Sequence, residues 1–463
     1  MNGMFGKDLT DGSIPRHLIS FAIPIMIGNL LTTGYSIVNA IWVGKILGGD
    51  AVAAVAVCLP VILALVALAS GSTMASSILI SHRYGAKDHS AIQKIVNNSW
   101  ALGTVLVLVI TALGLFITIP VLKLLGTDSR IINMAAGYLR INIAGFVFMY
   151  LSFLVNSILR GIGDTITPMI FMIIGTVINA VLDPLFIIGI GPVPKLGLNG
   201  AAVAAQLASA IATVLGLIYI NRKYRKQPVN PTKLEFDKQI TVLVIKIGLP
   251  SFIQQMLLSL SYAFSTAFVN IFGPFATAAY GVAGRIDSLA ALPAIAVMMS
   301  VSAVTAQNIG AGKPERVKEI FKWGVIINIP VVILITFFCV VFPGPVMRIF
   351  VNEVPVINYG IQYLRIVGFA YLLFIFIYVS NGVINGTGKT LIPMLLAFIS
   401  LCIVRVPIAE LLYRTSLGIR GVWFAIAISI TITAVCSLSY YFSGKWKKSS
   451  IKMGEPELKP AVE

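Results

Sequence analysis

Charged side chains are scarce in this chain of 463 residues, because Asp, Glu, Lys and Arg together make up only 11% of it. Soluble globular domains are typically about one quarter charged, so this composition excludes an ordinary water-soluble enzyme or binding module. Cysteine is also rare, and the four cysteines fall in apolar stretches without metal-ligand spacing: Cys58, Cys339, Cys402 and Cys436. We therefore expect them to pack as small apolar residues and to form neither a metal centre nor a disulfide framework.

Motifs that carry enzyme chemistry are absent too, since no apolar stretch holds a nucleophile–base pair or a metal-ligating cluster. The segment 310–313 (Gly-Ala-Gly-Lys) is similar to part of a phosphate-binding loop, but Pro314 replaces the Ser or Thr that would hold Mg²⁺. Gln307 also stands where the first glycine of that loop belongs. We therefore expect no enzymatic activity, no cofactor and no nucleotide hydrolysis.

Apolar residues, in contrast, make up 58% of the chain, and the mean hydropathy is +0.94. About 20 consecutive apolar residues cross a bilayer as a helix, and backbone amides in hydrocarbon have to be satisfied within that helix. Such stretches predict twelve transmembrane helices, over residues 17–46, 52–81, 93–121, 133–159, 167–190, 199–221, 240–272, 276–307, 319–347, 357–385, 391–413 and 420–443. The sequence therefore predicts an all-α integral membrane protein.

The formal net charge of +17 reflects 34 basic against 17 acidic residues. About 23 Lys and Arg fall on the side that carries both termini, about 7 on the other side and about 4 within spans. Because positive loops stay cytoplasmic, we predict a multi-pass protein of the cell (inner or plasma) membrane with both termini in the cytoplasm. The basic loops then contact anionic membrane lipids, and we expect no binding of nucleic acid.

The second half of the chain repeats the first. Residues 138–141 (Tyr-Leu-Arg-Ile) recur at 363–366, and Gly85-Ala86 recurs as Gly310-Ala311, each at an offset of 225 positions. The turn Gly161-x-Gly163-x-Thr165 followed by Pro168 recurs at the same offset. One offset shared by unrelated segments indicates an internal duplication.

Each repeat contains six predicted spans, and an even number gives both repeats the same orientation in the membrane. We therefore predict two parallel six-helix lobes, residues 1–228 and 229–463, around a central cleft that opens alternately to the two sides. We expect the chain to work as a monomer.

Ionisable groups within apolar spans are costly and are candidates for function. Asp183 lies in an otherwise apolar stretch, Asn179 precedes it by one helical turn, and Pro184 frees a backbone carbonyl. With Asn39 from the first span, these oxygens suit a proton or a sodium ion, so we predict a cation site at Asp183, Asn179 and Asn39. The alternative is that Asp183 only caps a helix that begins at Pro184.

Polar residues in spans seven and eight form a second group of candidates. We predict that they line the substrate cavity: Gln254, Gln255, Tyr262, Arg285 and Asp287. Arg285 and Asp287 have three possible roles, namely a pair that neutralises itself, a gate, or a contact to substrate.

Several short motifs together resemble multidrug and toxic compound extrusion (MATE) transporters over essentially the whole chain. They are Ala22-Ile23-Pro24, Trp42-Val43-Gly44, Arg160-Gly161-x-Gly163-Asp164, Asn179-x-x-x-Asp183-Pro184, Gly200-Ala201-Ala202 and Gln307-Asn308-x-Gly310-Ala311-Gly312. The resemblance implies an antiporter that exports amphiphilic, often cationic, small molecules in exchange for protons or sodium. The pattern at Asn179 and Asp183 is similar to the DinF-like branch, whose members usually carry aspartate where this chain has Asn39.

Two other transporter functions compete with this prediction. A flippase for a lipid-linked precursor has a related fold, but it is expected to have a more basic cleft than Arg285 and a few other bases provide. A symporter of the major facilitator type also has twelve spans. Its usual loop motif, Gly-x-x-x-Asp-Arg-x-Gly-Arg, is replaced here by residues 82–87 (His-Arg-Tyr-Gly-Ala-Lys).

Overall fold

The computed structural model describes residues 6–189, 194–225, 227, 229–231, 233–447 and 451, with the side chain of residue 41 left out. Nearly all of this part of the chain is helical, and none of it forms a strand. The helices are α1 (Ile14–Leu47), α2 (Gly49–Gly85), α3 (His89–Leu124), α4 (Ile132–Ala144), α5 (Phe146–Gly161), α6 (Ile166–Pro184), α7 (Leu198–Lys223), α8 (Lys238–Asn270), α9 (Pro274–Gly310), α10 (Arg316–Val341), α11 (Pro343–Arg348), α12 (Val354–Gly386), α13 (Leu391–Phe398), α14 (Val406–Tyr413) and α15 (Ile419–Phe442).

The twelve predicted spans are confirmed within the described residues. Eleven helices are long and apolar enough to cross a membrane, and the bent pair of α4 and α5 forms a twelfth span. Two spans contain a π-helical turn, at Leu185–Gly189 after α6 and at Ile399–Arg405 between α13 and α14. Residue 190, the predicted end of the fifth span, lies outside the described residues.

The fourth span bends by 41° between α4 and α5, which its apolar pattern did not predict. Gly145 stands at the bend, where a Cβ atom would lie 2.3 Å from Cγ of Gln206 on α7. Gln206 Nε2 donates a hydrogen bond of 3.1 Å to Oδ1 of Asn142. The bend is therefore fixed by a polar side chain of α7 that occupies the space a larger residue would need.

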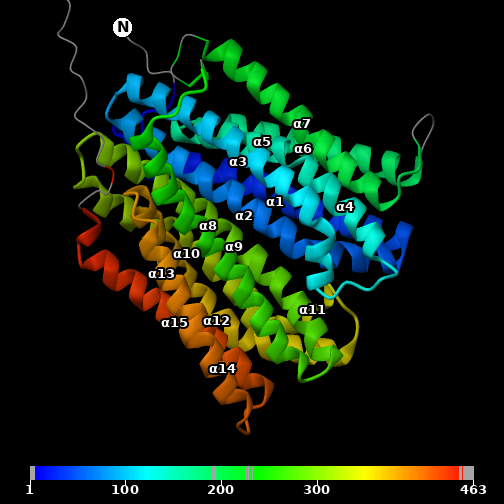
Figure 1. The fold of residues 1–463 in the computed structure, drawn as a ribbon. Coiled ribbons are helices and arrows are strands. Elements are labelled where there is room, and N and C mark those ends of the chain that lie inside the picture. The colour runs from blue at the N-terminus through cyan, green and yellow to red at the C-terminus, as the bar shows by residue number, and fades with distance from the viewer. Residues whose placement is uncertain are drawn as a thin grey trace, which may run out of the picture.

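The two halves of the chain form bundles that lie side by side, α1–α7 in blue to green and α8–α15 in green to red (Figure 1). Between them, α2 packs against α8 and α9, and α1 packs against α9 and α10. One buried apolar cluster lies mainly in the first half, a second lies in the second half, and a third joins residues of both. The predicted boundary residue 228 lies outside the described residues.

The repeats meet at equivalent positions where α2 and α9 end. A Cβ atom on Gly85 would lie 1.9 Å from the carbonyl oxygen of Gln307, and one on Gly310 would lie 1.8 Å from that of His82. Residues 82 and 307 occupy the same repeat position, as do Gly85 and Gly310. The contact is therefore reciprocal, as expected for two parallel repeats related by a two-fold axis. It closes the side of the molecule that carries both ends of the described chain, called here the terminal face.

A short segment before α1, residues 6–12, contacts both halves at the terminal face. Toward the first half, the amide of Gly6 donates to the Tyr84 hydroxyl at 3.0 Å. The amide of Lys7 donates to the carbonyl of Ile162 at 2.9 Å. We call residues 6–12 the bridging segment.

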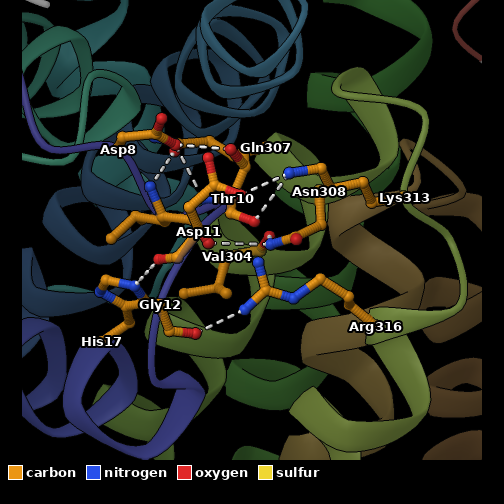
Figure 2. Close-up of polar contacts among 11 residues, drawn as sticks. Asp8, Thr10, Asp11, Gly12, His17, Val304, Gln307, Asn308, Lys313 and Arg316 are labelled. Carbon is orange, nitrogen blue, oxygen red and sulfur yellow. Dashed lines mark hydrogen bonds and ion pairs between the residues drawn. The ribbon is translucent and has the colours of Figure 1, made fainter.

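Toward the second half, the bridging segment is held by side chains of α9 and of the turn that follows it (Figure 2). Gln307 Oε1 accepts from the amide of Leu9 at 3.0 Å, and Asn308 Nδ2 donates to the carbonyl of Leu9 at 3.1 Å. Lys313 Nζ forms a 2.6 Å ion pair with Asp11. The Lys313 side chain lowers the pKa of Asp11 below its ordinary value. The ion pair is therefore fully formed at any pH above the ordinary pKa of an aspartate, and it is lost only as the pH falls through the lowered pKa.

Replacing Asn308 with Ala is expected to loosen the terminal face. Asn308 is buried, and its loss leaves the buried carbonyl of Leu9 without this donor, at a cost of about 1–3 kcal/mol. Faster hydrogen–deuterium exchange of residues 6–12 and of the last turn of α9 would show the effect. Lys313→Ala serves as a milder comparison, because the Lys313–Asp11 pair is largely exposed. Unchanged exchange in Asn308→Ala would contradict a bridging role for this segment.

Candidate functional site

The residues predicted to bind a cation lie where α1 and α6 face each other. Asp183 stands near the end of α6 with 2% of its surface exposed, and Asn179, one turn earlier on the same helix face, is 8% exposed. Pro184 has no amide hydrogen, so the helix loses a backbone bond there and continues as the π-helical turn Leu185–Gly189. The chain thus buries a carboxylate where the helix backbone is already irregular.

Two side chains of α1, Asn39 and Tyr35, contact the Asp183 carboxylate, and Tyr35 also contacts Asn179. Asn39 Nδ2 donates a hydrogen bond to Asp183 Oδ2 from α1, which confirms that the two residues lie together. The hydroxyl of Tyr35 contacts the same oxygen and also Asn179 Oδ1, at 2.7 Å from the latter. The sequence predicted an amide oxygen from Asn39, whereas the structure directs its amide nitrogen toward the carboxylate.

Tyr35 is the member of this group that the sequence analysis missed. A single tyrosine in a membrane helix is usually a packing or interfacial residue, so its type alone gave no signal. Its position did carry one, because Tyr35 precedes Asn39 by four residues and therefore lies on the same face of α1.

The other carboxylate oxygen of Asp183 is the chemically open position of the group. Oδ1 is buried and has no hydrogen-bond partner among the described residues. A buried polar atom without a partner is unfavourable, so this oxygen suits a proton or a bound cation. The described residues contain no group of three or more His, Cys, Asp or Glu side chains that could hold a metal ion. A single carboxylate balances one positive charge, which fits a proton or a monovalent ion better than a divalent one.

Replacing Tyr35 with Phe is expected to weaken cation binding while leaving the fold intact. The change removes the hydroxyl that contacts Asp183 and Asn179 but keeps the ring. Loss of one hydrogen bond to a charged group corresponds to about a tenfold lower apparent affinity for the coupling cation. Titration of transport against cation concentration would measure it. Tyr150→Phe is the matched control, since the Tyr150 hydroxyl accepts from Ser72 at 3.4 Å and has no interaction with Asp183 among the described residues.

Of the five residues in the second predicted group, Asp287 accepts hydrogen bonds, Tyr262 stacks on another ring, and the other three make no such contact within the described residues. Asp287 on α9 accepts hydrogen bonds from two tyrosines of α12, Tyr363 at 2.5 Å and Tyr371. No ion pair joins Arg285 and Asp287 within the described part of the chain, so the self-neutralised pair is not formed. Residues i and i+2 point to different sides of a helix, which explains the separation.

The remaining candidates lie on α8 and α9. Tyr262 stacks on the ring of Tyr280 with 5.0 Å between centroids, and Gln254 is partly buried. Gln255 and Arg285 are exposed, and neither makes a side-chain hydrogen bond within the described residues. The structure therefore leaves Gln254, Gln255 and Arg285 available for a ligand and ties Asp287 to α12.

Arg405 is a further polar residue of the second half that the sequence analysis did not single out. It lies in the π-helical turn between α13 and α14. Its guanidinium donates to the hydroxyls of Ser429 at 2.8 Å and of Ser261 at 3.0 Å. These bonds connect three elements of the second half, so Arg405 stabilises this bundle.

Comparison with known proteins places the arrangement in a family. The MatE family model matches the chain twice, over residues 24–185 and 250–411, which reproduces the internal duplication. The chain belongs to the MATE family. Among the relatives of this MATE protein, "Probable multidrug resistance protein YoeA" of Bacillus subtilis is 34% identical over 95% of this chain and 96% of its own length. "Probable multidrug resistance protein YpnP" of the same organism is 30% identical over 96% of this chain and 98% of its own length.

Solved MATE structures share the fold over nearly the whole chain. "Crystal structure of MATE in the straight conformation" matches with a TM-score of 0.88 and 26% identity, covering 96% of this chain and 98% of that one. A structure described as the outward-facing conformation of a multidrug resistance MATE family transporter of the MOP superfamily matches with a TM-score of 0.88 and 25% identity, at the same coverage. The predicted all-α fold with twelve spans is thereby confirmed.

Proposed function

We propose that this MATE-family chain is a cation-coupled antiporter that exports amphiphilic, often cationic, small molecules from the cell. The observation that carries the proposal is the buried Asp183 carboxylate, which has one oxygen held by neutral donors and the other without a partner. A bound proton or sodium ion neutralises this charge. The relatives named as multidrug resistance proteins support export of drug-like molecules.

The proposed cycle uses residues 1–228 and 229–463 as two lobes, with both termini in the cytoplasm of a monomer in the cell membrane. The terminal face is closed by the reciprocal contact of Gly85 and Gly310 and by the bridging segment. With the termini inside, the described conformation is outward-facing. Its similarity to a MATE structure described as outward-facing supports this assignment.

Exchange requires that cation and substrate favour opposite openings of the lobes, because a ligand with equal affinity for both states shifts no equilibrium. The cation binds at Asp183, Asn179 and Asn39, with Tyr35 as an additional contact. A proton adds to the carboxylate directly, whereas sodium draws on several oxygens of the group. Substrate binds between the lobes near Gln254, Gln255, Tyr262 and Arg285, and Asp287 shapes this region through α12.

Purified protein in liposomes tests the proposal and identifies the coupling ion. Vesicles carry a cationic dye, and a sodium gradient or a pH gradient is imposed separately. Dye movement that follows only one of the gradients identifies the coupling ion. Movement that follows neither gradient would contradict cation coupling, provided that the protein is inserted and folded.

A further inference from the structure

Two stripes of residues at identical spacing face each other along α1 and α6. Both helices start at the terminal face, so they run parallel, and the stripes follow positions i, i+4, i+7 and i+11. The stripes are Gly28, Thr32, Tyr35 and Asn39 on α1, and Met172, Thr176, Asn179 and Asp183 on α6. Contacts near both ends fix the register: Tyr35 with Asn179 at 2.7 Å, and Gly28 with Met172, whose Sδ would lie 3.0 Å from an added Cβ.

This seam between α1 and α6 is polar from the Asp183 site toward the terminal face. Thr32 and Thr176 lie between the two fixed ends, and their hydroxyls bond to carbonyls of their own helices at 2.9 and 2.8 Å. Eleven residues of α-helix separate Met172 from Asp183, a length of about 16 Å. Polar side chains thus recur along the two facing helices from the buried carboxylate to the level of Met172, with Thr32 exposed and Thr176 partly buried.

Arg160 stands at the end of this seam, at the last turn of α5. Its Nη2 lies 3.8 Å from Sδ of Met172, and its Nε is buried without a hydrogen-bond partner among the described residues. No carboxylate of the described chain lies within 4.0 Å of its guanidinium. Asp164, four residues later, is engaged by Thr167 and Lys223 instead. A cation largely out of water without a counterion is costly and therefore points to a function.

The repeat shows that the turn after α5 folds without this charge. The position that corresponds to Arg160 in the second half, at the offset of 225, is Asn385. Asn385 is buried at the end of α12 and is followed by the same glycine turn. The positive charge is therefore specific to the half that contains Asp183.

We propose that Arg160 is an electrostatic barrier that keeps the coupling cation at Asp183 from leaking through the α1–α6 seam to the cytoplasm. This inference rests on the proposed function. A fixed positive charge repels a passing proton or sodium ion, and the repulsion is strong where little water screens it. The reciprocal contact closes the path between the lobes, and Arg160 closes the polar path within the first lobe.

The test measures cation leak in liposomes without substrate, with the ion and gradient that drive the wild-type protein. Arg160→Asn introduces the residue of the second half, and we expect leak to rise by about tenfold or more. Arg160→Lys keeps the charge, so leak is expected to stay near the wild-type level. In the double variant Arg160→Asn with Asp183→Asn, leak is expected to fall again, because the seam no longer ends in a carboxylate.

A second variant keeps the test decisive if Arg160→Asn does not fold. Met172→Glu leaves the guanidinium of Arg160 in place but sets a carboxylate beside it. The carboxylate neutralises the positive charge, so we expect weaker repulsion of the passing cation and a higher leak. Wild-type leak in folded Arg160→Asn, or in folded Met172→Glu where Arg160→Asn does not fold, would overturn the barrier. That result differs from failure of the proposed function, in which the wild-type protein itself shows no cation-driven efflux.

Discussion

Asp183→Asn is expected to abolish cation-driven efflux while leaving a folded, membrane-inserted protein. The substitution keeps the size of the side chain and an oxygen that accepts from Tyr35 or Asn39, so the contacts between α1 and α6 persist. It removes the charge that a proton or sodium ion neutralises in the proposed mechanism. Because binding that differs between the two states is what drives exchange, dye accumulation should fall about 100-fold or more, to the level of protein-free liposomes.

Two comparisons separate loss of coupling from loss of structure. Substrate binding, measured by fluorescence with the same dye, should remain in Asp183→Asn, since the residues proposed to bind substrate belong to α8 and α9. The double variant Asn39→Asp with Asp183→Asn returns a carboxylate to the group from the facing helix and should restore part of the efflux. Normal cation-driven efflux in Asp183→Asn would remove the basis of the proposed mechanism.

Much of the architecture could be predicted because it depends on local pattern. Twelve apolar stretches and a repeat offset of 225 positions are visible in one sequence, and the helices and the two family matches agree with both. The bend at Gly145 was not predicted, because its cause is the Gln206 side chain on another helix. A straight span and a bent span have the same apolar composition, so hydropathy does not indicate where a span bends.

The candidate site shows the same limit. Asn179, Asp183 and Asn39 were predicted together, since a buried carboxylate needs polar neighbours, and the structure brings them into contact with Tyr35. The partners of Asp287 were not predicted. Arg285 is its neighbour in sequence, but the hydrogen bonds come from α12, 76 and 84 residues away. Which tyrosines meet a carboxylate is decided by helix packing.

Gly310→Ala is expected to open the terminal face and to slow transport. The added Cβ atom would lie 1.8 Å from the carbonyl oxygen of His82, and backbone cannot rotate away as a side chain does. Forcing an atom into a packed contact costs about 1–3 kcal/mol, so the ratio of closed to open molecules should fall by about 5- to 150-fold. Spin labels at Ser90 and Lys318, which are exposed and follow Gly85 and Gly310 by five and eight residues, would report the change as longer distances.

The same helix and the repeat supply matched variants. Gly281→Ala, also on α9, adds a Cβ atom where nothing lies within 4 Å, so the label distance and transport should stay at wild-type values apart from a small gain in helix propensity. Gly85→Ala meets the carbonyl of Gln307 from the other lobe and should reproduce the effect of Gly310→Ala. If Gly310→Ala and Gly281→Ala gave the same distances, closure at this contact would not control the cycle. Longer label distances in both Gly310→Ala and Gly85→Ala would instead show that the two equivalent glycines together control closure of the terminal face.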